Sequence, residues 1–324
     1  MAPNVKEDNI ESLEDDKFEK LVAPQASPWK FELLHPVVLY VFSIHVASVY
    51  GLYVSWSSVK WATVAFTLAY YVTSVQGITA GAHRLWSHKS YKAKLPLQIL
   101  YMIAQSATMQ YSIIWWASKH RQHHKFSDTD GDPHNATRHI FFSHIGWIMT
   151  RPHPEAVKRR KLVDVSDLKS NSVLAFQRRH MVLLNLLLAF LLPIIIPVYL
   201  WSENIYTAWH FNIFRVTITY HCIFFVNSIA HKWGMRPYDK KMQATQAPFV
   251  AHFSFGEGWH NFHHVFPWDY SSDELGSKFS FTTKVIDFFA KIGWAYDLKS
   301  VPKEVIYDRA HRTGDGSPVM KSVS

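Results

Sequence analysis

The stretch His-Arg-Gln-His-His at residues 120–124 decides how this chain must fold. On an α-helix its three imidazoles fall at positions i, i+3 and i+4, so they lie on one face. The stretch His-Asn-Phe-His-His at 260–264 repeats that spacing, and His-Arg-Leu-Trp-Ser-His at 83–88 places two more histidines five residues apart. Neutral imidazole is a common metal ligand. Three clusters far apart in sequence therefore predict one metal site, which the fold must assemble from three segments.

The number of histidines favours two metal ions over one. One triple alone fits a solvated basic helix face equally well, but the repetition favours metal binding. Imidazole ligands suit zinc, copper or iron. A structural zinc site uses four ligands, usually including Cys, and haem needs only two axial ligands, so a dinuclear iron site for oxygen chemistry fits the count better. Five residues turn an α-helix by about 140°, so we expect a helix to end between His83 and His88.

The composition points to a membrane protein with sizeable aqueous parts. Of the 324 residues 48% are hydrophobic, and the net charge is +9. Cys222 is the single cysteine, which excludes an internal disulfide and a Cys-based zinc ribbon. The basic residues are scattered among apolar segments without a recognition motif, which argues against nucleic-acid binding. A basic surface facing the cytosol suits an anionic substrate or partner.

Four apolar stretches are long enough to cross a bilayer. The links between the first and second and between the third and fourth are short, poor in Lys and Arg and flanked by tryptophans, whereas the long segments are rich in Lys and Arg. The positive-inside rule therefore puts both termini and every histidine cluster on the cytosolic side. The predicted spans are residues 34–55, 60–82, 181–200 and 209–230, and the predicted cytosolic cap comprises residues 83–179 and 231–300.

We make separate predictions for four further segments. Residues 97–116 are apolar, but a crossing there would put two histidine clusters on opposite sides, so we expect a helix in the interface or packed on the cap. Residues 281–298 predict another helix. Residues 1–30 are polar and predict a disordered tail without a cleaved signal peptide. Residues 301–324 predict a C-terminal tail, which leaves 31–300 as the functional domain.

One longer motif contains the 83–88 cluster, and four further motifs lie elsewhere in the chain. They read GITAGAHRLWSHKSYKA at 77–93, DPHNATR at 132–138, FFSHIGW at 141–147, NSIAHKWG at 227–234 and RPYDK at 236–240. Together they strongly resemble the membrane acyl-CoA desaturases of animals, and most of all the insect branch that includes moth sex-pheromone desaturases. The resemblance covers roughly residues 35–300. It implies an all-α protein of the endoplasmic reticulum membrane, with four transmembrane helices under a cytosolic helical cap that holds a di-iron site.

The same resemblance implies the reactants and the metal ligands. Such enzymes use fatty acyl-CoA, O2 and electrons from cytochrome b5 and its reductase. The chain has no nicotinamide-binding GxGxxG and no fused cytochrome b5 signature, so its electron donor is expected to be a separate protein. Asn227 matches a residue that reaches a metal through water. The nine implied iron ligands are His83, His88, His120, His123, His124, His231, His260, His263 and His264. The histidines at 35, 45, 134, 139, 144, 153, 180, 210, 221, 252 and 311 match no ligand position and are expected to be structural or solvated.

Several residues implied to bind substrate depart from the family pattern. Near the CoA head group, Ser118 and Lys119 stand where Arg-Asp is common, and Tyr111 replaces Asn. Trp116 matches the tryptophan at the bend of the acyl tunnel. The Thr-Trp pair opposite that bend is replaced by two apolar residues, which puts ordinary Δ9 placement in question. These two residues are Ile223 and Phe224.

The far end of the tunnel and one further signature set the expected product. Tyr71 and Val75 match the aromatic and small residues that close the tunnel, and valine predicts a shorter substrate of 16 or 14 carbons. The four residues after RPYDKKM read QATQ, and the final Gln246 resembles the moth Δ11-type lineage. We therefore expect a Δ11 desaturase of pheromone biosynthesis. Alternatives are a Δ9 desaturase of general lipid metabolism, a histidine-box hydroxylase and, from a different class, a membrane metal transporter.

Overall fold

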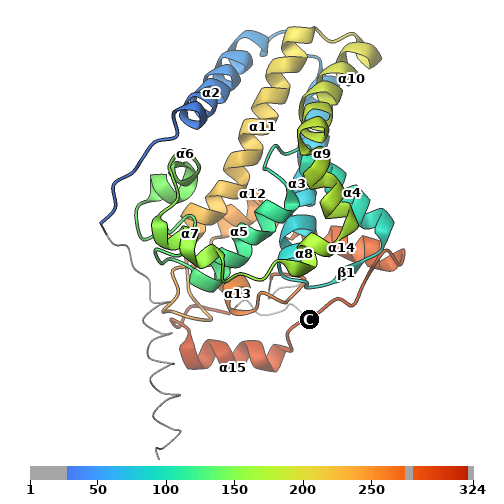
Figure 1. Cartoon of the computed structure of the whole chain (residues 1–324). Coiled ribbons are helices and arrows are strands. Elements are labelled where there is room, and N and C mark those ends of the chain that lie inside the picture. Colours follow the sequence, from blue (N-terminus) through green and yellow to red (C-terminus); the bar gives the residue numbers. More distant parts are fainter. Residues whose placement is uncertain (1–27, 274–279, 320–324) are drawn as a thin grey trace, which may run out of the picture.

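The computed structural model describes residues 28–273 and 280–319, which form a mostly helical molecule (Figure 1). Three of its helices are long and apolar enough to cross a membrane: α2 (His35–Ser55), the continuous helix Ser172–Trp201 and the continuous helix Ile205–His231. They coincide with the predicted spans 34–55, 181–200 and 209–230. In Figure 1 these long helices occupy one end of the molecule, and the cap with the short helix α15 occupies the other.

The stretch predicted as the second span, 60–82, is helical throughout. Helix α3 (Trp61–Gln76) continues without a break into the π-helix η1 (Gly77–Ser87). Helix α3 packs against α11 and α10 within the long-helix layer, while η1 contacts α4 and α5. By itself α3 has 16 residues, about 24 Å at 1.5 Å per residue. Its role as a fourth membrane crossing stays a prediction.

The long helix Ser172–Trp201 changes from α-helix to π-helix and back along its length. It runs through α9 (Ser172–Asn185), η3 (Leu186–Leu191) and α10 (Leu192–Trp201). His180 interrupts it with non-helical angles, φ −108° and ψ 15°. The kink falls where the polar sequence of the cap gives way to the apolar run from Met181, so the predicted start of the span at 181 coincides with a bend in the backbone.

Helix α11 (Ile205–Ser228), extended by the 3-10 turn η4 (Ile229–His231), is the central helix of the layer (Figure 1). It packs against α2, α3 and α10, and its contacts with α2 are the most extensive of all element pairs. Hydrogen bonds link the α2 and α11 side chains, which is how polar groups are satisfied between helices in lipid. The pairs are Tyr40–Tyr220 at 3.1 Å, His45–His221 at 2.9 Å and Ser48–Thr217 at 2.7 Å.

The apolar stretch 97–116 is two helices, which corrects the prediction of one. Helix α4 (Leu95–Ser106) ends before a loop, and helix α5 (Ile113–Phe126) begins after it. Met109 and Tyr111 in that loop have left-handed backbone angles, φ 60° and 58°, which no α-helix accommodates. Ser112 then caps α5 by accepting a hydrogen bond from the backbone N–H of Trp115.

The cap consists of short elements around α5. The segment predicted as a helix over 281–298 is shorter: α14 ends at Lys291 and the chain turns at Gly293, φ 73°, into strand β2. Helix α15 falls within the predicted C-terminal tail and contributes Ile306 to the buried apolar cluster that includes Phe262. Residues 1–27 and 320–324 of the predicted tails lie outside the described residues. The cap elements are β1 (Lys92–Ala93), η2 (Phe142–Gly146), α6 (Trp147–Met149), α7 (Pro154–Arg160), α8 (Ser166–Ser170), α12 (Pro248–Phe253), α13 (His260–Val265), α14 (Phe281–Lys291), β2 (Ala295–Tyr296), which pairs antiparallel with β1, and α15 (Lys303–Thr313).

Candidate metal centre and adjoining cavity

The nine histidines expected as ligands meet in the cap as two neighbouring groups. Within each group, the ligand atoms all lie within 4.8 Å of one another. Neither group belongs to one sequence cluster, because each HxxHH helix contributes to both. The first group is His83, His88, His120, His124 and His263; the second is His123, His231, His260 and His264.

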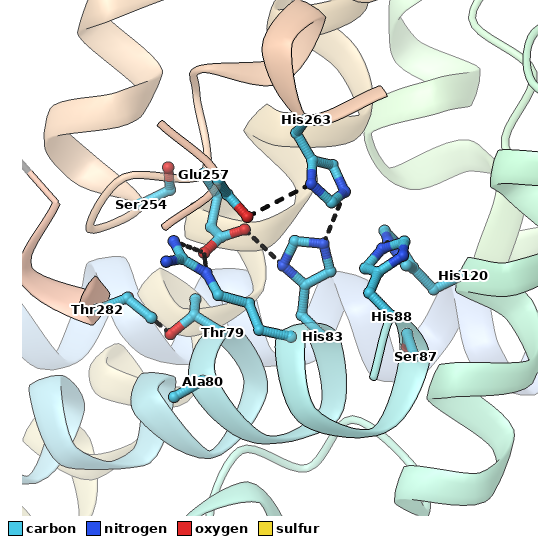
Figure 2. A network of polar contacts seen from close by, with 12 residues as sticks. Thr79, Ala80, His83, Ser87, His88, His120, Ser254, Glu257, His263 and Thr282 are labelled. Carbon is cyan, nitrogen blue, oxygen red and sulfur yellow. Dashed lines mark hydrogen bonds and ion pairs between the residues drawn. The ribbon is translucent and has the colours of Figure 1, made fainter. Parts of the chain in front are cut away.

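The Nε2 atoms converge at distances that suit a shared ion. In the five-histidine group, Nε2 atoms are 2.9 Å apart between His83 and His263 and 2.8 Å apart between His88 and His120 (Figure 2). In the four-histidine group, His260 Nε2 lies 3.0 Å from the Nε2 atoms of both His231 and His264. A metal bonded to imidazole nitrogen at about 2.0–2.1 Å has neighbouring ligands at such separations. The donor set therefore fits two ions.

The residues inside the 120–124 motif hold its helix in place. Arg121 donates to the backbone oxygens of Trp86 (2.6 Å) and Ser87 (3.0 Å), and it also forms a bidentate pair with Asp167 at 2.7 and 2.8 Å. These bonds fasten α5 to the end of η1, next to His88. Gln122 points the other way and donates to the carbonyls of Gly131 and Ala156. Every position of HRQHH thus either faces the metal groups or anchors the helix that presents them.

The π-helix explains how His83 and His88 join one group. We expected a helix end between them, and η1 does end there, at Ser87 with His88 as its C-cap. The backbone N–H of His88 donates to the carbonyl of His83 at 3.2 Å, the i→i+5 bond of a π-turn. The wider turn returns residue i+5 to the side of residue i, which an α-helix does not do.

The 260–264 motif is held from the loop that precedes it. The Asn261 side-chain oxygen accepts from the backbone N–H groups of Tyr238 and Asp239, so it anchors the RPYDK segment. Gln246, the last residue of QATQ, accepts from the backbone N–H groups of Asn261 (3.1 Å) and Phe262 (3.3 Å) at the start of α13. Gln246 is buried and does not line the cavity described below. Its contact is therefore with the ligand helix.

Three buried carboxylates orient the imidazoles from behind, and the sequence did not single them out. Glu257 lies 2.6 Å from Nδ1 of His83, Asp132 lies 2.8 Å from Nδ1 of His123, and Asp128 lies 3.1 Å from Nδ1 of His231. A carboxylate accepts, so Nδ1 carries the proton and the Nε2 lone pair faces the centre. In the sequence, Asp128 and Asp132 closely follow HRQHH and Glu257 closely precedes HNFHH, and this proximity could have identified them. Glu257 also binds Arg84 at 2.7 Å.

The protonation states favour metal binding. Burial lowers the pKa of most of these imidazoles well below the usual value, and neighbouring imidazoles lower it further. For His123, burial opposes protonation, but the charge and hydrogen bond of Asp132 together with the charge of Asp128 prevail and raise the pKa. Burial opposes ionisation of Glu257, but Arg84 and His83 prevail and lower its pKa to about 2. The centre thus combines six imidazoles that burial keeps neutral with the ionised carboxylate of Glu257. The six imidazoles with a lowered pKa are His88, His120, His124, His260, His263 and His264.

A cavity of about 380 Å³ adjoins the centre between α2, α5, α11 and the 107–112 loop. Its lining is mostly apolar, as expected of a pocket for an acyl chain. A smaller cavity of about 30 Å³ is lined by His83, His123 and His260, among others, and four residues border both spaces. These four are Trp116, His120, Ile223 and Asn227. Five of the predicted substrate residues line the larger cavity: Tyr111, Trp116, Lys119, Ile223 and Phe224.

The other predicted substrate residues lie elsewhere. Tyr71 and Val75 pack in an apolar cluster with Cys222, on the side of Trp116 and Ile223. They do not border either cavity, and Val75 is fully buried. The Ser118 hydroxyl donates to the Ile114 carbonyl within α5 and does not line the cavity. His134, expected to be structural, lies beside the centre: it forms a further group with His123 and Asp132.

Comparisons with known proteins agree with this geometry. A family model described as "Fatty acid desaturase" matches residues 59–275. An acyl-CoA Delta(11) desaturase of Spodoptera littoralis is 49% identical over 98% of this chain and 94% of that protein. A (11Z)-hexadec-11-enoyl-CoA conjugase of Bombyx mori is 48% identical over 98% of both chains. An acyl-CoA Delta-9 desaturase of Acheta domesticus is 45% identical over 98% of this chain and 92% of that protein.

Proposed function

The chain belongs to the fatty acid desaturase family, and from that premise we propose that it is a Δ11-type acyl-CoA desaturase. It introduces a double bond into a saturated acyl-CoA of 14 to 16 carbons, in the biosynthesis of unsaturated fatty acids or sex pheromones. The observation that carries the proposal is the placement of nine converging imidazoles beside a largely apolar cavity. An unactivated methylene offers no acidic proton, so general acid–base groups are of no use to this reaction.

Two iron ions complete the proposed site. His83, His88, His120, His124 and His263 hold one ion; His123, His231, His260 and His264 hold the other, with Asn227 as an additional contact through water. When bound, the pair supplies the oxidation in which O2, two electrons and two protons combine with two substrate hydrogens to give two waters. The carboxylates of Glu257, Asp128 and Asp132 keep the imidazoles oriented.

The chain's own residues decide which carbons reach the centre. Reacting atoms must be held within about 3–3.5 Å, and the lining between Trp116 and Ile223 provides a narrow passage next to His120. The Trp116 ring stacks on His120, with centroids 5.1 Å apart and planes 18° apart. The mostly apolar walls exclude water from the reacting bond. Tyr111 and Lys119 also line the larger cavity, and we assign them to the thioester and CoA.

The remaining parts of the proposal concern the setting. The protein lies in the endoplasmic reticulum membrane with four crossing helices, including the α3–η1 segment, and with both termini in the cytosol. Its net charge of +9 suits the phosphates of CoA and an acidic electron donor such as cytochrome b5, which its reductase supplies with electrons. Long-range attraction of this kind acts on the association rate and weakens with salt.

Position 11 is favoured over position 9 by two observations. Relatives named for Δ11 activity are 49% and 48% identical to this chain over nearly its full length, whereas the cricket Δ9 relative is 45% identical. The passage beside the centre is bordered by Ile223, and the neighbouring cavity wall by Phe224, where the family pattern has Thr-Trp.

Expression in desaturase-deficient yeast, with derivatised mapping of double bonds, tests the proposal. The expected product is a Δ11-monounsaturated 14- or 16-carbon acid. A product with only Δ9 bonds would replace the Δ11 assignment by general Δ9 desaturation. A hydroxylated acid would identify a hydroxylase instead. Metal uptake into vesicles without oxygen consumption would identify a transporter. His124→Ala serves as the matched inactive control.

A further inference from the structure

The loop between α4 and α5, residues 107–112, is held in an unfavourable backbone conformation beside the cavity. Met109 and Tyr111 both have positive φ angles, 60° and 58°. Residues with a Cβ rarely adopt this region, and bulky side chains least of all. Such a conformation persists only where surrounding contacts determine it, and it is often found at functional sites.

Side chains from two helices, α11 and α4, supply those contacts by binding four carbonyls of the loop. Arg215 of α11 donates to Ala107 at 2.9 Å, and Tyr220 of the same helix donates to Met109 at 3.0 Å. Gln105 of α4 donates to Gln110 at 3.4 Å and to Tyr111 at 3.0 Å. Gln177 of α9 in turn donates to the side-chain oxygen of Gln105 at 2.5 Å.

The loop is coupled to the passage beside the metal centre. Met109, Gln110 and Tyr111 all line the larger cavity. The side-chain oxygen of Gln110 accepts from the indole N–H of Trp116 at 3.3 Å, and Trp116 stacks on His120 and borders both cavities. A shift of the loop therefore moves Gln110 and releases Trp116, which changes the depth at which an acyl chain passes the centre.

Tyr220 joins this loop to two long helices. Its single hydroxyl proton goes to the Met109 carbonyl, so the neighbouring Tyr40 hydroxyl of α2, 3.1 Å away, must be the donor toward Tyr220. One hydroxyl of α11 thus connects α2, α11 and the loop at the cavity wall. Within the part of the chain that the structure describes, Tyr40 makes no hydrogen bond to the loop, so the two phenols differ in the contact with Met109.

We propose that Tyr220 is a positioning residue that determines where along the acyl chain the double bond is placed, by holding the 107–112 loop against the cavity. This inference rests on the proposed function. Tyr220 acts through the Met109 carbonyl, Gln110 and Trp116, so its hydroxyl affects the identity of the product more than the presence of the metal.

The test compares two phenylalanine substitutions that each remove one hydroxyl. Tyr220→Phe removes the bond to Met109, while Tyr40→Phe leaves it in place. In yeast, Tyr220→Phe should lower the ratio of the main positional isomer to the others by about threefold to tenfold, the range expected for one hydrogen bond. Tyr40→Phe should leave the ratio within about twofold of wild type. Isomer ratios are independent of how much enzyme accumulates, so they separate positioning from loss of folded protein.

A second variant approaches the same loop from α4. Gln105→Glu replaces the donor to Tyr111 by an oxygen while keeping the acceptor of Gln177, and it should shift the ratio in the same direction. Amide hydrogen exchange of residues 107–112 in the purified proteins should be faster in Tyr220→Phe and unchanged in Tyr40→Phe. Exchange reports on the loop whether or not the enzyme forms product, so a wild type without unsaturated product refutes the proposed function alone.

Three outcomes overturn the inference. One is an unchanged isomer ratio together with unchanged exchange in Tyr220→Phe. Another is an equal shift in Tyr220→Phe and Tyr40→Phe, which would mean that the hydroxyl pair acts on the substrate directly. The third is complete loss of product in Tyr220→Phe with normal iron content, which would assign the hydroxyl a role other than positioning.

Discussion

Replacing Glu257 by Gln should remove metal from the five-histidine group alone. Glu257 accepts on both oxygens: one lies 2.7 Å from Arg84 Nη2, and the other lies 2.6 Å from Nδ1 of His83 (Figure 2). Both Arg84 and Glu257 are buried, with side chains 1% and 6% exposed. A glutamine side chain keeps only one of those oxygens. Its NH2 group must therefore face either the guanidinium or the imidazole.

The magnitudes decide between the two arrangements. In both arrangements the neutral amide removes the ion pair with Arg84. An amide NH2 against Arg84 also places donor against donor and leaves the buried guanidinium without this acceptor, which costs more than an unsatisfied neutral donor does, about 1–3 kcal/mol. An NH2 against His83 instead requires Nδ1 to accept, which moves the imidazole proton to Nε2 and removes the lone pair that faces the centre. Changes of this kind behind a ligand lower metal affinity about tenfold to a hundredfold, or about 1.4–2.8 kcal/mol. The second arrangement costs less, so we expect it.

The assay is iron content per purified protein during stepwise competition with a chelator. Wild type should hold two irons; Glu257→Gln should release one at about tenfold to a hundredfold lower chelator concentration and retain the other. Glu203→Gln is the matched control, because Glu203 is a buried carboxylate too but lies in the link between α10 and α11, where it accepts from the backbone N–H groups of Lys60 and Asn204. Equal release of both irons from wild type and Glu257→Gln would refute the reasoning.

Three further substitutions have expected outcomes. His124→Ala removes one imidazole of the five-histidine group and should abolish desaturation and lower the iron content while membrane insertion continues; normal turnover would contradict the metal assignment. Val75→Ala should extend the preferred substrate by about one to two carbons, since each added methylene gains about 0.8 kcal/mol on burial; an unchanged chain-length profile in yeast would exclude Val75 from the end of the tunnel. Gln246→Glu keeps an acceptor for the α13 backbone N–H groups and touches no cavity, so the mapped double-bond position should not change; a move to Δ9 would show that the QATQ signature specifies the product.

In this protein the last residue of the lineage signature, Gln246, is not among the residues that line the cavity. Gln246 resembles a Δ11-type marker, yet its side chain binds the start of the ligand helix α13. Trp116 and Ile223 are among the residues that border both cavities. Under the proposed function, these residues and not Gln246 would select the carbon that is oxidised.

Local sequence patterns alone predicted the membrane-crossing helices and the histidine-bearing helix faces of this protein. The i, i+3, i+4 spacing of HRQHH and HNFHH is a property of one helix and needs no partner, so the common face of each triple was predictable. Hydropathy over some twenty residues is equally local, and three helices that could cross a membrane appeared where it placed them. His231 was predicted as a ligand only from the resemblance to known desaturases, because a single histidine at a helix end forms no spacing pattern with other histidines.

The tertiary structure decided what depends on distant partners. The division of HRQHH between two metal groups follows from which helices surround α5. Glu257 and Arg84 are 173 residues apart, so no window of sequence contains the pair that orients His83. The break at 107–112 is stabilised by Arg215, Tyr220 and Gln105 through carbonyl contacts that helix propensity does not register. HRQHH alone specified a metal-binding face, and long-range hydrogen bonds and packing set which two centres it serves and which passage leads to them.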